Sequence, residues 1–165
     1  MPGSIYSGTI ADLPRESRFG DTYRRTGLVM DQCNMCFVWN DPNPLKDGET
    51  MDFEMGMHSH ACDMMFIVME GDYVWQLGDE RRRIKKGDFV YIPRDMPHGG
   101  RNISTEEGYA LEIFAPIRTD YLYVAEHQLA QHQASREDDG ARVDKRSIAE
   151  AAAQMGDMTL HPPRR

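Results

Sequence analysis

The sequence predicts an all-β domain, a barrel or a sandwich, followed by a short helical extension. Short runs of strand-forming residues are separated by Gly-Asp turns at close intervals, which is the pattern of such folds. After Pro116 the pattern changes, and apolar residues recur three and four positions apart, as they do on a helix. The 165 residues are enough for one domain with a real hydrophobic core. We therefore expect one domain with appendages.

Three segments follow from these patterns. Residues 1–23 mix Pro, Gly, Ser and charge without strong periodicity, which predicts an arm that lies over the domain or pairs with a partner's sheet. Residues 24–118 form the β-domain, and residues 119–165 form the helical extension and tail. Within the extension we expect one helix over 120–134 and a second that opens with a capping box at Ser147.

The strands of the β-domain are expected in order along the chain. A β-rich run over 24–39 is followed by a loop over 40–48 that contains two prolines and a glycine. Pro116 ends the last strand. The remaining strands are expected near 51–60, 64–69, 73–77, 81–85, 89–92 and 108–115, with turns at 70–72, 78–79 and 86–88.

Charge and composition narrow the class of partner. The net charge of -8 argues against nucleic acid and anionic membranes, because both need a basic surface. The chain has no apolar run long enough to span a membrane and no signal peptide, so we expect a soluble, cytoplasmic protein that binds a small molecule. The basic run over 80–86 is expected to be a solvated face or a dimer contact. His127 and His132 are expected on the surface.

The three cysteines do not indicate a disulfide framework, because their number is odd. Cys33 and Cys36 have the spacing of a redox or zinc pair, but the apolar run over 28–39 predicts a strand. Residues three apart on a strand face opposite sides. We therefore expect two unlinked thiols.

Three histidines could bind a metal. His58 and His60 alternate, so on an extended strand they would share a face with Cα atoms roughly 6.5 to 7 Å apart. His98 would complete a facial set. Neutral imidazole suits Zn, Cu, Ni and Fe, and three imidazoles on one side of a cation leave positions open for water or substrate. This layout is typical of a catalytic site.

The segment from Gly87 to Asn102 resembles the second motif of the small single-domain cupins, G-x5-P-x-G-x2-H-x3-N. Asp95 replaces its middle glycine. The resemblance covers about residues 24–122 and implies an RmlC-like cupin, with a double-stranded β-helix or jelly-roll barrel and a short helical C-terminal extension. Relatives of this kind are often homodimers, so a homodimer is expected.

The first cupin motif, G-x5-H-x-H-x3,4-E-x6-G, is matched at His58, His60 and Gly71. Asp52 replaces its first glycine. Met64 stands where a Glu or Gln ligand is expected, and a thioether is a weak donor for Fe(II), Mn(II) or Zn(II). The resemblance thus implies one divalent transition metal (Fe, Zn, Mn or Ni) on three ligands: His58, His60 and His98.

Two neighbours of these ligands leave alternatives open. Asp63 could supply a fourth ligand only through a bulge or twist, because it faces the opposite side of the strand. Cys62 is interpreted as a small buried thiol. Six methionines near the first motif could line a flexible apolar wall or simply fill the core: Met51, Met55, Met57, Met64, Met65 and Met69. The expected substrate-pocket residues are Met64, Phe66, Tyr91 and Phe114.

The segment over 111–122 is similar to the (D/E)-x-F-x-P-x-R segment that closes the barrel in uronate-linearising, pectin-degradation cupins. The matching positions are Glu112 and Arg118. A buried carboxylate near a metal can act as general acid or base, and an arginine can hold a substrate carboxylate by two hydrogen bonds. The alternative is a structural Glu112–Arg118 ion pair.

Three functions remain open. The first is a metal-dependent lyase or isomerase that acts by acid–base chemistry on a small carboxylate- or carbonyl-bearing molecule, with Glu112 moving the proton and Arg118 holding the acid group. The second is an Fe(II) dioxygenase that uses the three histidines. The third is a small-molecule-binding cupin without turnover.

Overall fold

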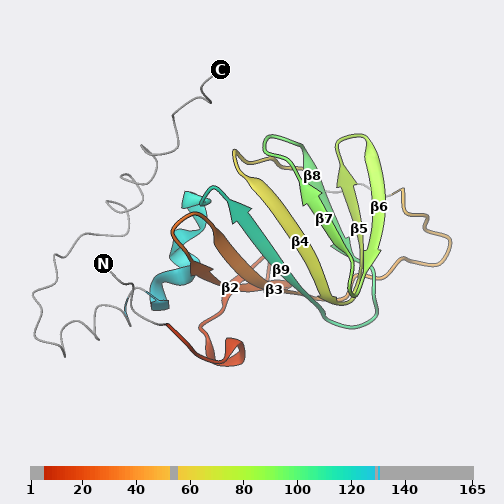
Figure 1. Cartoon of the computed structure of the whole chain (residues 1–165). Coiled ribbons are helices and arrows are strands. Elements are labelled where there is room, and N and C mark those ends of the chain that lie inside the picture. The colour runs from red at the N-terminus through yellow and green to blue at the C-terminus, as the bar shows by residue number, and fades with distance from the viewer. Residues whose placement is uncertain (1–5, 53–55, 129, 131–165) are drawn as a thin grey trace, which may run out of the picture.

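The computed structural model describes residues 6–52, 56–128 and 130. Their strands form two sheets, one of six strands in the order β1-β2-β3-β9-β4-β7 and one of three in the order β6-β5-β8. Figure 1 shows β5, β6 and β8 gathered on one side of the barrel and β2, β3 and β9 on the other. All pairings within the two sheets are antiparallel. This is the all-β jelly-roll barrel that the sequence predicts.

The bounds of the larger sheet's strands are β1 (Glu16–Arg18), β2 (Tyr23–Val29), β3 (Asn34–Asn40), β4 (Asp63–Glu70), β7 (Phe89–Ile92) and β9 (Gly108–Ala115). The smaller sheet contains β5 (Asp72–Leu77), β6 (Glu80–Lys85) and β8 (His98–Asn102). Two 3-10 helices flank the barrel, η1 (Ile10–Asp12) and η2 (Thr119–Ala125).

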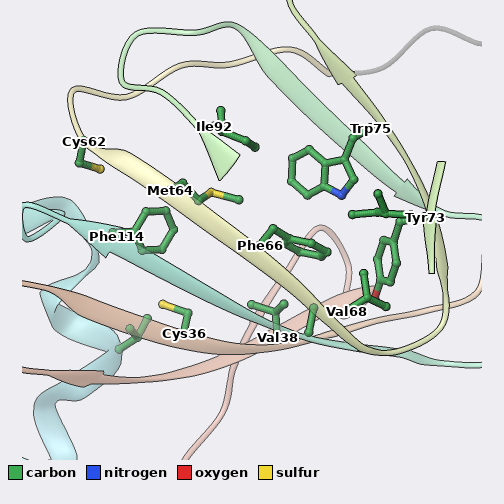
Figure 2. Close-up of a cluster of buried hydrophobic side chains, with 13 residues drawn as sticks. Cys36, Val38, Cys62, Met64, Phe66, Val68, Tyr73, Trp75, Ile92 and Phe114 are labelled. Carbon is green, nitrogen blue, oxygen red and sulfur yellow. The ribbon is translucent and has the colours of Figure 1, made fainter. Parts of the chain in front are cut away.

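The core lies between the sheets, and strand alternation explains why. On β4 every second residue is buried, beginning with Met64 and Phe66, because side chains alternate between the two faces of a strand. On β9 the buried positions include Glu112 and Phe114, and these pair with Phe66 and Met64 respectively. Figure 2 shows the resulting cluster, with Trp75 entering from the smaller sheet. The cavity described below is lined by several of these side chains.

The expected run over 24–39 is a hairpin rather than one strand. Residues 30–33 turn between β2 and β3, and the Met30 amide donates to the Cys33 carbonyl at 2.8 Å. The polar residues at 31 and 32 are the sequence signal for this turn. Cys33 therefore lies in a turn while Cys36 is buried on β3, and both are free thiols, as expected.

The expected strand over 51–60 is wrong. Residues 56–60 form no strand, and only His58 makes an isolated bridge, with His98. The chain passes unusually close to β8 here, since a Cβ atom on Gly99 would lie 2.7 Å from the Gly56 carbonyl oxygen. Glycine allows this approach, which brings the irregular segment against β8. β8 itself was not among the expected strands.

The ends of the described chain pack on the barrel. β1 pairs with β2, so this part of the N-terminal arm joins the chain's own sheet. η2 buries Leu122, Val124 and Ala125, and a Cβ atom on Gly27 would lie 2.4 Å from Val124 Cγ2, so this close packing requires glycine. Residues 119–125 thus form a 3-10 helix within the helix expected over 120–134, and residues 126–128 and 130 are α-helical. Most of the rest of that helix, and the one expected at Ser147, lie outside the described residues.

The basic run over 80–86 lies along β6 on the surface, where its charged side chains pair with acidic neighbours. Ion pairs join Arg82 to Glu80 and Lys86 to Glu70. A solvated, paired face explains the run without a nucleic acid. Across the described segments, no helix is long and apolar enough to cross a membrane.

Candidate metal centre

Three histidines from two segments converge at one place in the barrel. His58 and His60 lie on the irregular segment before β4, and His98 begins β8. One potential ligand nitrogen from each of the three lies within 4.8 Å of those of the other two. The ring centroids of His58 and His60 lie 4.3 and 4.8 Å from that of His98. The bridge between His58 and His98, with backbone hydrogen bonds of 2.9 and 2.8 Å, fixes the two segments side by side.

The hydrogen bonds of the half-buried His60 and the buried His98 leave one nitrogen of each ring available. His60 Nδ1 lies 2.8 Å from the Cys62 carbonyl oxygen, and His98 Nδ1 lies 2.8 Å from the Met96 carbonyl oxygen. A carbonyl only accepts, so each Nδ1 carries the proton and each Nε2 keeps its lone pair. Within the described chain, both Nε2 atoms are buried without a hydrogen-bond partner.

This arrangement fits a metal ion. A buried acceptor without a partner is costly, and a cation would satisfy both Nε2 atoms. Backbone carbonyls that hold the other ring nitrogen are a common feature of metal-binding histidines. Because metal–nitrogen bonds are about 2.0–2.1 Å long, binding would draw the three nitrogens closer together.

The protonation state of the three rings also suits coordination. Burial lowers the pKa of His98 to about 4, and it lowers the pKa of His58 and His60 as well. The positive charge of Arg118 acts in the same direction on all three. The imidazoles are therefore neutral at pH 7, which is the form that binds a metal.

No carboxylate joins the described histidine group. Met64 is 3% exposed and lines the adjoining cavity, in the position where the motif has an acidic ligand. The alternative of Asp63 as a fourth ligand is not supported, because its Oδ1 accepts the Arg94 amide hydrogen at 2.9 Å and forms an ion pair with the Arg94 side chain. Burial raises the pKa of the Cys62 thiol to about 11, so this neighbour of His60 stays neutral.

A cavity of about 930 Å³ is lined by His58 and His98 and runs into the barrel. Met64, Phe66 and Phe114 line it, as expected from the sequence. Tyr91 does not, because Ile92 is the buried residue at this end of β7 while Tyr91 is 52% exposed on the outer face. Of the two alternatives for the six methionines, the apolar wall does not form among the described residues, because Met64 alone of them lines the cavity. Met51, Met57 and Met69 are exposed, and Met55 lies outside the described residues.

Glu112 is a buried acid in this cavity. It lies on β9 between Cys36 of β3 and Phe66 of β4, and it is 7% exposed. Burial raises its pKa to about 7, against the opposing effect of the Arg25 and Arg118 charges. The Tyr23 hydroxyl donates to the carboxylate at 3.4 Å. Near neutral pH this group can therefore either give or take a proton.

Arg118 lines the same cavity from the end of the barrel. Its guanidinium carbon lies 3.6 Å from the ring centroid of Tyr121 and 5.2 Å from that of Phe114. The ion pair that the structure gives it is with Asp120, at 3.1 Å, so the expected alternative of a Glu112–Arg118 pair does not form in the described chain. Stacking on an aromatic ring orients the planar group and leaves it beside the cavity.

Sequence reasoning missed several cavity residues, namely Tyr23, Arg25, Trp75, Tyr121 and Tyr123. None belongs to a recognisable motif. One signal was available for Arg25, a charged residue that shares the alternation of the apolar residues on β2, where it is 4% exposed.

Comparisons with known proteins place this geometry in context. Residues 48–114 match the family model for the cupin domain. An uncharacterised protein of Aquifex aeolicus (strain VF5) is 38% identical over 60 residues, which cover 36% of this chain and 49% of that protein. The match therefore spans about half the length of this curated relative.

Two solved structures have a similar fold. KdgF from Halomonas sp. superposes with a TM-score of 0.56 at 19% identity, over 67% of this chain and 94% of that one. An RmlC-like cupin from Shewanella frigidimarina NCIMB 400 gives 0.57 at 19% identity, over 73% and 99%. At this level of identity the likeness establishes a shared fold.

Proposed function

We propose that this chain, whose residues 48–114 match the family model for the cupin domain, is a metal-dependent enzyme of lyase or isomerase type. Its substrate would be a small carboxylate- or carbonyl-bearing molecule, and its chemistry would be metal-assisted proton transfer. The observation that carries the proposal is one cavity that is lined by His58, His98 and a buried carboxyl group with a pKa of about 7, with His60 beside the other two histidines.

The histidines would hold the metal. His60 and His98 offer buried Nε2 lone pairs, and the more exposed His58 completes the set. A bound divalent cation would act as a Lewis acid that polarises a substrate carbonyl or hydroxyl oxygen. With no acidic side chain in the group, such a centre would keep its full positive charge.

Glu112 would move the proton. A general acid or base works best when its pKa lies near the working pH, and burial brings the pKa of Glu112 to about 7. The Tyr23 hydroxyl supports the ionised form by hydrogen bonding and holds the carboxylate in place. Both side chains line the cavity, so a substrate carbon can lie beside the carboxylate.

Arg118 would hold an acidic group of the substrate. Its guanidinium is fixed over Tyr121 and beside Phe114, and its planar fork matches a carboxylate. The exposed Asp120 that now pairs with it can be displaced towards water at little cost.

A proton-exchange assay tests the role of Glu112. A panel of uronates, hydroxy acids and keto acids is incubated in D₂O with the protein loaded with Zn(II), Mn(II), Ni(II) or Fe(II), and exchange or conversion is followed by proton NMR. We expect at least one compound to react, and Glu112→Gln to lower that rate by about 100-fold or more with unchanged metal content. Glu126→Gln, at an exposed glutamate of the helical extension, is the matched control. Retained turnover in Glu112→Gln would contradict the proposal.

One observation favours a second candidate, an Fe(II) dioxygenase. Met64 takes the place of the acidic ligand of the motif, which leaves a group of three neutral nitrogens with room for further ligands. An oxygen electrode separates the two functions. Oxygen consumption that requires Fe(II) and an organic substrate supports the dioxygenase, whereas turnover with Zn(II) in the absence of oxygen supports acid–base chemistry.

A further inference from the structure

Four arginines line the cavity, and one of them, Arg101, is already bound to Glu49 and to two backbone carbonyls. We call the other three, Arg18, Arg25 and Arg118, the arginine cluster. The proposed function uses Arg118 alone. The other two come from β1 and β2, the hairpin at the edge of the larger sheet. Their presence in the same cavity wall needs its own explanation.

Arg18 and Arg25 share a single carboxylate. Arg18 Nε contacts Glu16 Oε1 at 2.8 Å, and Arg25 Nε contacts Glu16 Oε2 at 2.9 Å. Both guanidinium groups also donate to the hydroxyl of Tyr123. The two cations and one anion of this group therefore have a net charge of +1. Because Arg25 is 4% exposed, little of that charge is screened by water.

One tyrosine ring links the two parts of the cluster. The guanidinium carbons of Arg25 and Arg118 lie 4.0 and 3.6 Å from the ring centroid of Tyr121. The two cations can be no farther apart than the sum of these distances, and both line the same cavity. Stacking also fixes the planes of both groups before any ligand arrives.

We propose that the substrate is a short dicarboxylic acid that carries a hydroxyl or carbonyl group. Arg118 binds one carboxylate, and Arg25 with Arg18 binds the other. The inference rests on the proposed function, because it names the substrate class of the same cavity. A single surplus charge matches a singly charged carboxylate better than a doubly charged phosphate ester. The forked N–H groups of arginine match the two oxygens of a carboxylate.

The turn after Arg18 supports its placement at the cavity. Phe19, Gly20 and Asp21 all have positive φ angles, of 54°, 67° and 69°. Two of them are not glycine, and such conformations persist only where the surrounding structure holds them. The turn sets the exposed Phe19 on the cavity wall, edge-on to Tyr23. The hairpin thus directs Arg18 towards the cavity.

Matched acids test the inference. Isothermal titration calorimetry measures binding of malonate, succinate, glutarate and adipate, and of the monocarboxylic acids with the same carbon counts, to the Zn(II)-loaded protein. We expect at least one diacid to bind about tenfold or more tightly than its monoacid, as charge-assisted hydrogen bonds predict. Equal affinity in all four pairs would overturn the inference.

Arginine variants show which side chains produce the preference for diacids over monoacids. Arg18 is half exposed, so Arg18→Gln is tolerated structurally and should reduce the diacid preference while leaving monoacid affinity unchanged. Arg25→Gln should do the same, with circular dichroism to confirm folding. Arg82→Gln, which removes a paired surface arginine on β6, is the control and should change neither affinity. Equal weakening of both acids by Arg18→Gln would contradict a second carboxylate site.

A further titration separates failure of the dicarboxylic acid inference from failure of the proposed metal-dependent function. The same titrations are run on His98→Ala without metal. Suppose that the wild type binds no metal but that it and His98→Ala both prefer diacids, and that this preference depends on Arg18. That result would support the inference and contradict the proposed metal site. A wild-type protein that binds one metal ion but shows no diacid preference would overturn the inference and leave the proposed function intact.

Discussion

The histidine group and the arginine cluster differ in whether their polar atoms already have partners in the protein. The histidine group is uncharged at pH 7, and two of its buried Nε2 atoms have no partner within the described chain. The arginine cluster is charged, and its guanidinium groups already contact Glu16, Asp120, Tyr121 and Tyr123. The histidines thus have free lone pairs that a cation could bind, whereas contacts within the protein already fix the arginine side chains. This difference supports the two proposals made above, a metal ion at the histidines and an anionic ligand at the arginines.

Phe114 joins the two regions, and its loss should have the largest effect on stability. Its ring is edge-on to His60 at 5.5 Å and to Tyr121 at 5.4 Å, and the side chain is fully buried. Phe114→Ala should lower the free energy of unfolding by about 3–5 kcal/mol, measured by urea denaturation. Phe89→Ala, at a 64% exposed ring, should change it by less than about 0.5 kcal/mol. Similar losses in both would show that the two regions are not joined through this ring.

Glu112 lines the same cavity as both regions, and its charge depends on pH near neutrality. Burial raises its pKa from the ordinary 4.5 to about 7. Its contribution to stability is therefore full below pH 4.5 and is lost as the pH rises through 7. Relative to Glu112→Gln, the wild type should lose on the order of 3 kcal/mol between pH 4.5 and pH 8. A difference in unfolding free energy that stays constant over this range would contradict the raised pKa.

A variant of Tyr123 tests whether the arginine cluster is held in place independently of metal binding. Its hydroxyl accepts N–H groups from Arg18 and Arg25. Tyr123→Phe removes this acceptor and should lower the free energy of unfolding by about 1 kcal/mol, with no change in metal content. Loss of metal in this variant would show that the two regions depend on each other more than the contacts indicate.

The histidine group could be predicted from the sequence because short motifs encode it. His58 and His60 are two residues apart, and His98 lies in a motif with fixed spacing, so their roles follow from local pattern even though the expected strand around them is wrong. Their convergence depends on the bridge between the two segments and on the close approach of Gly56 and Gly99. The sequence does not show that contact.

The arginine cluster could not be predicted because it is assembled by topology. Arg18, Arg25 and Arg118 come from three separate segments, which meet through the β1–β2 pairing and the packing of η2 on β2. No spacing in the sequence relates them. Tyr91 shows the opposite error, since an aromatic residue in a motif was assigned to the pocket, but strand alternation places it outside.

Elemental analysis tests directly whether His58, His60 and His98 hold one metal ion. Wild type, His98→Ala and the control His127→Ala are purified without added metal and analysed side by side. Metal loss confined to His98→Ala, from about one ion per chain to less than about a tenth, is the predicted result. Equal metal in all three proteins, or none in the wild type even after incubation with Fe(II), Zn(II), Mn(II) and Ni(II), would contradict the account.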